Sequence, residues 1–469
     1  MRYFILLAIV ASISVGQSIV QAEDKQTLND REKKLIDEYI DKRLKEQHTN
    51  TNNTKLSLNN IPGQFNFSGF ILSEWEDSDN LGSDGSRINT TAFDSSDKTD
   101  RITEGNTFGN LGLDWTLDST TAHLVLEFGE YAAGLTNSSG QLGADTTDIE
   151  VKNFYIDHDF GNGWEISAGI QGIVADPLGF IMDDDQTAFT TTYTINEQHK
   201  LWAYVAETHT GTSRRQTDDQ SFFGINAEVA RENTTWTPFW IHLKDRSTSN
   251  QDKVIDFYGF HTLWKHGDWE IESEYIYNSG RTLETGNGSN KSTSLRGQLA
   301  DIKIKRNIED SFLSSLSAEW IHTSGGRGKT ASGTSNGSQH HFQSQDPQVG
   351  YRLNIADSDG SDLAPGTSRL APINLALAEG INTIIVEAQW QASTKLSGYI
   401  RQAWLRTDVS NPITGTGVKN IGRESDAGLQ YLLNDYLKFK MDYGYLKTGA
   451  YFSPHSDAHL FTSALLLEF

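Results

Sequence analysis

The sequence predicts an all-β protein: a transmembrane antiparallel β-barrel of 16 strands, with 18 as the fallback, and a short N-terminal α-helical coiled coil. Three observations support this. Apolar and polar residues alternate in many segments after residue 63, which is typical of strands with two different faces. Short turn signals and long polar segments separate these segments. The last ten residues form one more alternating segment, and the chain ends on Phe469.

The final segment, 460–469, carries the argument for closure. Its odd positions are Phe461, Ser463, Leu465, Leu467 and Phe469. A last strand with nothing after it leaves a sheet edge, and a closed barrel removes that edge by pairing the last strand with the first. We expect the odd face to meet lipid and Thr462 and Glu468 to face the lumen. The same alternation places Leu466 on the lumen face, where a hydrated interior does not explain an apolar side chain.

The same segment resembles the C-terminal signature of bacterial outer-membrane proteins. The resemblance implies that the barrel-assembly machinery reads a membrane-assembly signal formed by Phe461, Leu465, Leu467 and Phe469.

The N-terminal region divides into three parts. Residues 1–22 combine Arg2, a short apolar run and small residues, which predicts a secretory signal peptide. Residues 23–48 carry a narrow apolar stripe at helical spacing between charged residues, which predicts a periplasmic coiled-coil helix or, alternatively, a helix lying on the barrel rim. Residues 49–63 are polar and rich in breakers and predict a linker. The barrel is expected over 64–469.

Composition excludes several classes of function. The formal net charge of −23 provides no basic stripe for phosphates, so nucleic acid is not an expected partner. The chain has no cysteine, which excludes thiolate metal sites and thiol catalysis. With 41 glycines, 8 prolines, 11 tryptophans, 16 tyrosines and 22 phenylalanines, the composition favours β-structure.

Seventeen segments qualify as strands. A bacterial barrel with both termini in the periplasm needs an even number, so one segment is spurious or one is missing. The candidates are 64–75, 106–117, 122–128, 148–158, 164–174, 199–208, 221–231, 235–244, 254–264, 269–277, 297–306, 311–322, 381–391, 394–406, 424–433, 437–445 and 460–469.

The connections are expected to differ at the two rims. Tight turns are predicted at 118–119, 161–163, 267–268 and 434–435, and long loops at 76–105, 131–147, 279–296 and 323–380. The loop 323–380 contains an apolar part, 370–377. We expect it either to fold inward as a constriction or to form a surface flap.

No enzymatic constellation is found, and no cofactor is expected: there is no nucleophile elbow, no His-Glu-x-x-His pair and no phosphate loop. The acidic clusters at 183–185 and 357–362 are candidate calcium loops, but solvated acidic loops explain them better. The pair His340 and His341 is a weaker metal candidate.

Function is therefore expected in the lumen. The alternation places nine charged residues on the inward face, and such charges set pore selectivity. An equally good alternative is that neighbours such as Glu272 and Lys303 pair across strands and stiffen the wall. The nine pore-lining candidates are Glu270, Glu272, Glu274, Asp301, Lys303, Lys305, Arg401, Lys438 and Lys440.

The whole arrangement resembles the siderophore porins typified by the legiobactin receptor (the LbtU family). The phosphate-type porins also have a coiled coil, but their rows of Arg and Lys do not match this lumen. The resemblance implies a Gram-negative outer-membrane protein that takes up a small solute, most simply a ferric siderophore, without a plug domain. It also implies a possible homotrimer held by the coiled coil. The alternatives are a general diffusion porin and a non-transporting adhesin or structural barrel.

Overall fold

A computed structural model describes the barrel region of the chain. The described residues are 62–79, 101–129, 148–209, 219–246, 251–286, 289–309, 311–326, 338–339, 342, 353, 380–409, 419–450 and 457–469. The predicted signal peptide, coiled-coil helix and most of the linker lie outside them, as do His340, His341 and the acidic cluster 357–362. Among the described residues, no helix has the length and apolar character needed to cross a membrane.

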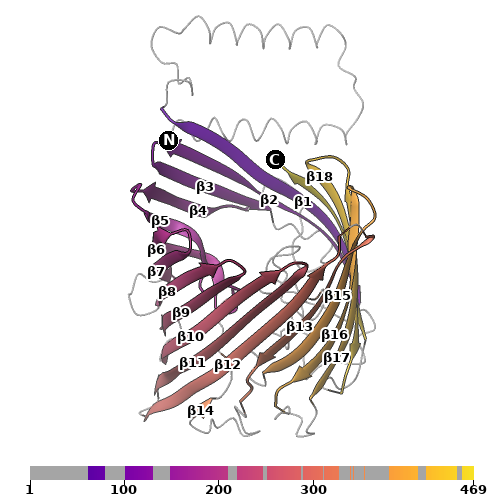
Figure 1. Cartoon of the computed structure of the whole chain (residues 1–469). Coiled ribbons are helices and arrows are strands. Elements are labelled where there is room, and N and C mark those ends of the chain that lie inside the picture. Colours follow the sequence, from indigo (N-terminus) through magenta and orange to yellow (C-terminus); the bar gives the residue numbers. More distant parts are fainter. Residues whose placement is uncertain are drawn as a thin grey trace, which may run out of the picture. The chain divides into compact units, whose positions relative to one another are not determined.

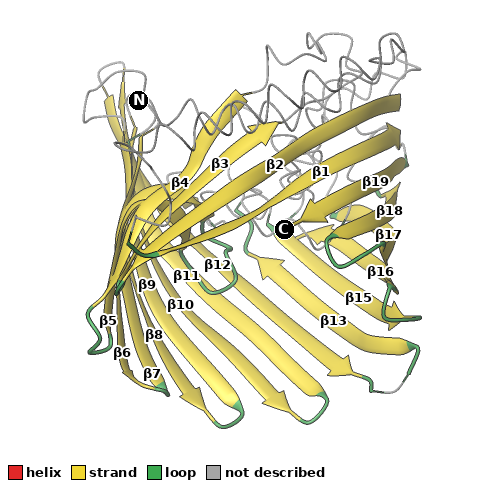
Figure 2. Cartoon of the chain, turned by 90° about the horizontal axis from the view of Figure 1, so that it is seen from above, coloured by secondary structure: helices red, strands yellow, loops and turns green. Residues whose placement is uncertain are grey.

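The described residues form nineteen strands in one sheet that closes on itself, and every pairing is antiparallel except that of the short β14 (Figures 1 and 2). They are β1 (Gln64–Asp79), β2 (Arg101–Leu117), β3 (Thr120–Gly129), β4 (Asp148–Asp159), β5 (Trp164–Val174), β6 (Asp183–Asn196), β7 (His199–His209), β8 (Asp219–Arg231), β9 (Thr234–Asp245), β10 (Gln251–His266), β11 (Trp269–Gly286), β12 (Ser289–Asn307), β13 (Leu313–Thr323), β14 (Ser338–Gln339), β15 (Ile381–Gln391), β16 (Leu396–Thr407), β17 (Asn420–Leu432), β18 (Leu437–Thr448) and β19 (Ala458–Glu468).

The seam of the barrel joins the first and last strands of the wall. β19 pairs with β1 from Phe70 opposite Glu468 to Asp79 opposite His459. The backbone of Phe469 adds two hydrogen bonds to Gly69, at 2.9 and 3.0 Å. The terminal segment therefore has no free edge, as the sequence predicts.

The wall has 18 strands, so the expected number of 16 is wrong and the fallback of 18 is correct. β14 is a two-residue strand that pairs in parallel only with Ser294 and Leu295 of β12, and β13 pairs directly with β15. The strand missed from the sequence is β6. Its run of threonines after Asp183–Asp185 has few apolar residues, so the alternation is weak, and the acidic cluster starts a strand instead of forming a loop.

The two rims differ as expected. Turns of two to five residues join the strands at the rim where β1 begins and β19 ends, and Asp118 takes a positive φ of 53° in one of them. One predicted long loop, 279–296, is wrong: residues 279–286 continue β11 and residues 289–296 belong to β12, and the two strands pair out to Gly286 opposite Ser289. Its polar Ser, Thr and Asn residues hide the strand pattern.

The wall has an apolar outer face and a mixed inner face. Large apolar side chains at alternate positions are exposed on the outside, among them Phe154, Ile156, Phe260, Tyr275 and Ile400. On the inside, the strand ends nearest the long-loop rim carry a buried apolar cluster that includes Ile241, Phe257, Leu299, Ile385 and Leu405. The lumen is therefore not wet along its whole length. A smaller cluster of Leu72, Phe108, Ala464 and Leu466 explains the inward Leu466 beside the seam.

Candidate functional site

All nine charged residues predicted from the sequence lie on the inner face of the wall. On β11, Glu270, Glu272 and Glu274 alternate with exposed outward residues such as Trp269 and Tyr275. By the same alternation Asp301, Lys303 and Lys305 of β12, Arg401 of β16, and Lys438 and Lys440 of β18 point inward.

The strand register arranges three of these residues, Glu270, Lys305 and Arg401, into a belt across neighbouring strands. Glu270 lies opposite Lys305, which lies opposite Ser317. Ser317 lies opposite Glu387, Glu387 opposite Arg401, and Arg401 opposite Asp426. Acidic and basic side chains therefore alternate along one continuous row that spans β11 to β17.

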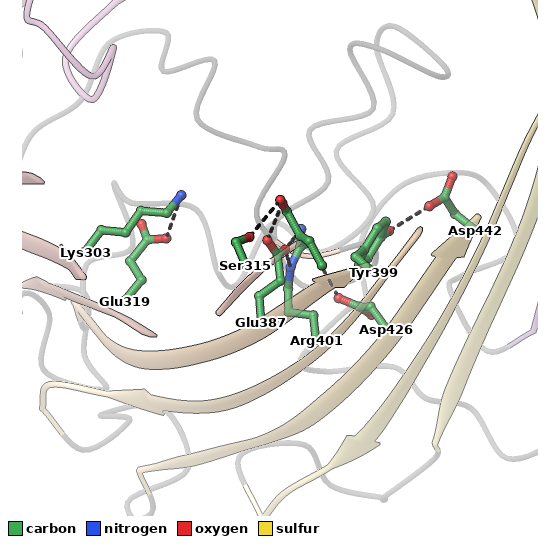
Figure 3. Close-up of polar contacts among 9 residues, drawn as sticks. Lys303, Ser315, Glu319, Glu387, Tyr399, Arg401, Asp426 and Asp442 are labelled. Carbon is green, nitrogen blue, oxygen red and sulfur yellow. Dashed lines mark hydrogen bonds and ion pairs between the residues drawn. The ribbon is translucent and has the colours of Figure 1, made fainter. Parts of the chain in front are cut away.

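Arg401 is the centre of the most tightly bound part of the belt (Figure 3). Its guanidinium Nε and Nη2 donate to Glu387 Oε2 at 2.8 and 2.6 Å. Its Nη1 lies 3.9 Å from Asp426 Oδ2. The side chains of Arg401 and Asp426 are 12% and 0% exposed, so this is a buried ion network. Sequence reasoning missed Glu387 and Asp426, although the alternation in 381–391 places Glu387 inward.

A chain of polar contacts continues from Glu387 toward the short-turn rim. Gln389 Nε2 donates to Glu387 Oε1 at 2.7 Å, and Ser315 Oγ donates to Gln389 Oε1 at 3.1 Å. These contacts fix the carboxylate that faces Arg401.

The expected pairing of Glu272 with Lys303 is replaced by other close contacts. The two residues are register partners. However, Lys303 Nζ lies 3.8 Å from Glu319 Oε2 on the next strand, and Glu272 Oε1 lies 3.2 Å from His261 Nε2. Glu270 pairs with Lys265 at 3.1 Å. The charges of the wall therefore do pair across strands. Their partners, however, are residues outside the nine predicted ones.

Tyr399 lies beside the Arg401 network (Figure 3). Its hydroxyl donates to Asp442 Oδ1 at 2.6 Å, and the Arg401 guanidinium carbon lies 4.8 Å from its ring centroid. Gly428 makes this position possible, because a Cβ there would lie 2.0 Å from the ring. Beside the ring is a cavity of about 440 Å³, lined by residues that include Gln389, Gln430, Lys440 and Asp442.

The loop between β5 and β6 folds into the lumen, although the sequence pattern does not predict a constriction there. Residues 175–182 join β5 to β6, and Phe180, Ile181 and Met182 belong to the buried apolar cluster of the inner wall. Asp176 fastens the turn: its carboxylate accepts hydrogen bonds from the backbone N–H groups of Phe180 and Ile181, at 2.8 and 2.7 Å. Phe342 and Leu353 of the long loop 323–380 are buried in the same cluster.

A second polar cluster lies on the inner face of β2 to β5. The ring nitrogens of His123 lie 2.8 Å from Asp114 Oδ1 and 3.0 Å from Asp157 Oδ2, and the ring stacks on Tyr155. Ser167 donates to Asp157 instead of to the imidazole. A nucleophilic serine needs its hydroxyl on the base, and here the hydroxyl of Ser167 is bound to the carboxylate instead.

Among the described residues, no group of His, Asp and Glu is arranged to hold a metal ion. Asp183–Asp185 lie at the start of β6, and Asp185 accepts a hydrogen bond from Asn153 at 2.6 Å. This cluster is part of the strand ladder.

The residues of the predicted assembly signal lie on the outer face of β19. Phe461 and Leu465 are exposed, Leu467 shares their face, and the side chain of Phe469 is 51% exposed although its backbone completes the seam. Lys438 Nζ donates to Glu468 on the inner face.

The closed antiparallel wall with a charged inner face has the fold of bacterial outer-membrane porins. No protein-family model matches the chain, and no curated protein matches it. Solved structures do match. OccK8 (OprE) of Pseudomonas aeruginosa is 11% identical, with a TM-score of 0.53 over 87% of this chain and 99% of that chain. OccK11 (OpdR) of the same organism is 11% identical, with a TM-score of 0.52 over 87% and 97%. Pseudomonas aeruginosa OpdK with vanillate is 11% identical, with a TM-score of 0.51 over 86% and 98%.

We expect the β5–β6 loop to limit the open pore. Burial raises the pKa of the Asp176 carboxyl, so the docked loop favours the protonated form. Docking is then strongest at pH values below the ordinary pKa of an aspartate, and it weakens as pH rises from that value through the raised pKa. Single-channel conductance should rise with pH in the native chain. The dependence should be weaker in Asp176→Asn, where the Glu274 carboxyl that is hydrogen-bonded to Asp176 remains.

Asp176→Ala, which removes the acceptor for two backbone N–H groups, should raise the conductance at every pH. The matched control is Asp159→Ala. Asp159 also accepts a hydrogen bond from a backbone N–H group, that of Gly161, but it lies in a turn at the opposite rim. An unchanged conductance in Asp176→Ala would show that the loop does not limit the pore.

Proposed function

We propose that this protein is an outer-membrane porin of a Gram-negative bacterium that passes a small solute through the barrel. The observation that carries the proposal is the combination of an apolar outer face with a charged belt on the inner face from β11 to β17. A non-transporting surface barrel does not need ionised side chains lining its interior, because each of them is costly to desolvate.

The wall favours cations over anions. To the predicted acids the described strands add the inward Glu319, Glu387, Glu424, Asp426 and Asp442, without a matching gain in bases. The cavity beside Tyr399 offers a partly apolar ring, amide groups and one charge of each sign, which suits a cationic or zwitterionic solute.

Planar-bilayer recording tests the proposal. Purified full-length protein should give stepwise conductance and a reversal potential that indicates cation preference. Glu270→Gln with Glu272→Gln should reduce that preference, because both side chains lie on the inner wall. Asp435→Asn, in an exposed short turn, removes the same kind of charge away from the wall and should leave it unchanged. Protein that inserts into the bilayer without conductance would refute the porin function.

The narrower proposal for the solute is a ferric siderophore, supported by the resemblance of the chain's organisation to the LbtU-type siderophore porins. A deletion strain should then lose growth on the cognate siderophore under iron limitation and keep growth on haem. Equal growth of the deletion strain and the parent strain on every siderophore tried would refute the siderophore proposal, while the porin proposal would stand.

The proposed homotrimer rests on the apolar stripe in 23–48. Crosslinking of the full chain should give a trimer that disappears when residues 24–47 are deleted. A trimer that persists without these residues would move the interface to the barrel.

A further inference from the structure

Three basic side chains gather on the outer face of β16, β17 and β18, near the long-loop rim. Arg406, Arg423 and Lys447 are all exposed. They alternate with buried inward residues such as Leu405, Glu424 and Leu446, so they point away from the lumen. In a chain with a net charge of −23, such a concentration of positive charge on one stretch of outer wall needs an explanation.

The register places like charges directly opposite each other. Arg423 on β17 is the cross-strand partner of Lys447 on β18. Side chains in this relation have Cβ atoms about 4.5–5.5 Å apart, and like charges there are destabilising. Arg406 stands on the same outer face one strand away, two residues beyond Trp404, which is opposite Arg423. No hydrogen bond or ion pair among the described residues neutralises any of the three.

Neighbouring residues on the outer face indicate where the three basic residues lie relative to the membrane. Trp404 and Ile384, which lie in the same row of the outer face as Arg423, are exposed at 39% and 47%. Aromatic residues next to an apolar wall mark the level of a membrane interface. The basic residues therefore lie at the edge of the apolar band on the long-loop side, where lipid headgroups would be.

We propose that Arg406, Arg423 and Lys447 form a binding site for the phosphate groups of an anionic lipid in the outer leaflet. The inference rests on the proposed placement in the outer membrane. A phosphate between Arg423 and Lys447 removes their mutual repulsion and gains charge-assisted hydrogen bonds, for which the forked guanidinium groups are well suited. The acyl chains of the same lipid would cover the exposed apolar residues below the site.

The test measures the thermal unfolding midpoint of the full-length protein in neutral detergent micelles. The probes are a bisphosphorylated lipid A, the same lipid without its phosphates, and inorganic phosphate alone. Only the phosphorylated lipid should raise the midpoint of the native chain. In Arg423→Gln with Lys447→Gln this increase should fall by at least half, and it should disappear when Arg406→Gln is added.

The matched control replaces Arg231 and Lys395 with Gln, because both are exposed basic residues at the short-turn rim. This variant should keep the full increase. Without lipid, the Arg423→Gln, Lys447→Gln protein should unfold at the same or a higher temperature than the native chain, because like-charge repulsion is removed. That comparison separates loss of binding from loss of folding.

Three results would overturn the site: an equal increase with the dephosphorylated lipid, an increase with inorganic phosphate alone, or an unchanged increase in the triple variant. The conductance experiment decides the porin function separately. Conductance without lipid stabilisation would refute only the lipid site, and lipid stabilisation without conductance would refute only transport.

Discussion

Arg401→Ala should destabilise the barrel by about 3–5 kcal/mol, because it leaves buried carboxylates without their cation. Glu387 and Asp426 both face the guanidinium, and the side chain of Asp426 is fully buried. The cation–π contact with Tyr399 is lost as well. Chemical unfolding in detergent micelles, followed by tryptophan fluorescence, measures the change in the free energy of unfolding.

Lys305→Ala is the matched control, because Lys305 lies in the same belt but is only half-buried. Its effect should stay within about 0.5–1 kcal/mol. Arg401→Lys should fall between the two, since an ammonium keeps the charge but cannot make the forked contact with Glu387. If Arg401→Ala and Lys305→Ala had equal effects, the network around Arg401 would contribute nothing specific to stability.

The belt also shows how much of the site is visible in the sequence. Alternation alone places residues such as Glu272 and Lys303 on the inner face, because the side-chain period of a strand is fixed at two. It does not give their partners, since those depend on the register in which neighbouring strands pair. Lys303 meets Glu319 through the register of β12 and β13, and Arg401 meets Glu387 through the register of β15 and β16.

The missed features share a different cause. β6 has little apolar alternation because its outer and inner faces both carry threonines. The polar hairpin of β11 and β12 is held by backbone pairing, which leaves no hydrophobic pattern. The inward loop 175–182 has an apolar end, Phe180 to Met182. These residues pack in a cluster to which more than ten other strands contribute, so the local sequence does not show where they are buried. The alternation of apolar and polar residues predicts strands that have one apolar face. It does not predict segments such as these, which are stabilised by contacts with other parts of the barrel.

Phe469→Ala should separate assembly from stability. Phe469 is 51% exposed, so its ring lies at the surface of the folded barrel. Its backbone hydrogen bonds with Gly69 do not depend on the ring. Substitution of an exposed side chain changes the free energy of unfolding by about 0.5 kcal/mol or less. Protein refolded in detergent should therefore unfold like the native chain.

In cells the same substitution should reduce the amount of folded protein in the outer membrane several-fold, because the terminal aromatic residue is the proposed signal for the assembly machinery. Heat-modifiable migration on gels of membrane fractions measures the folded amount. Phe461→Ala is the comparison variant, since Phe461 belongs to the same predicted signal and is an exposed outward residue of the same strand, farther from the terminus. Equal losses in both variants would mean that the apolar face of β19, and not its last residue, is what assembly requires. An equal loss in the refolded protein would assign Phe469 to packing of the seam.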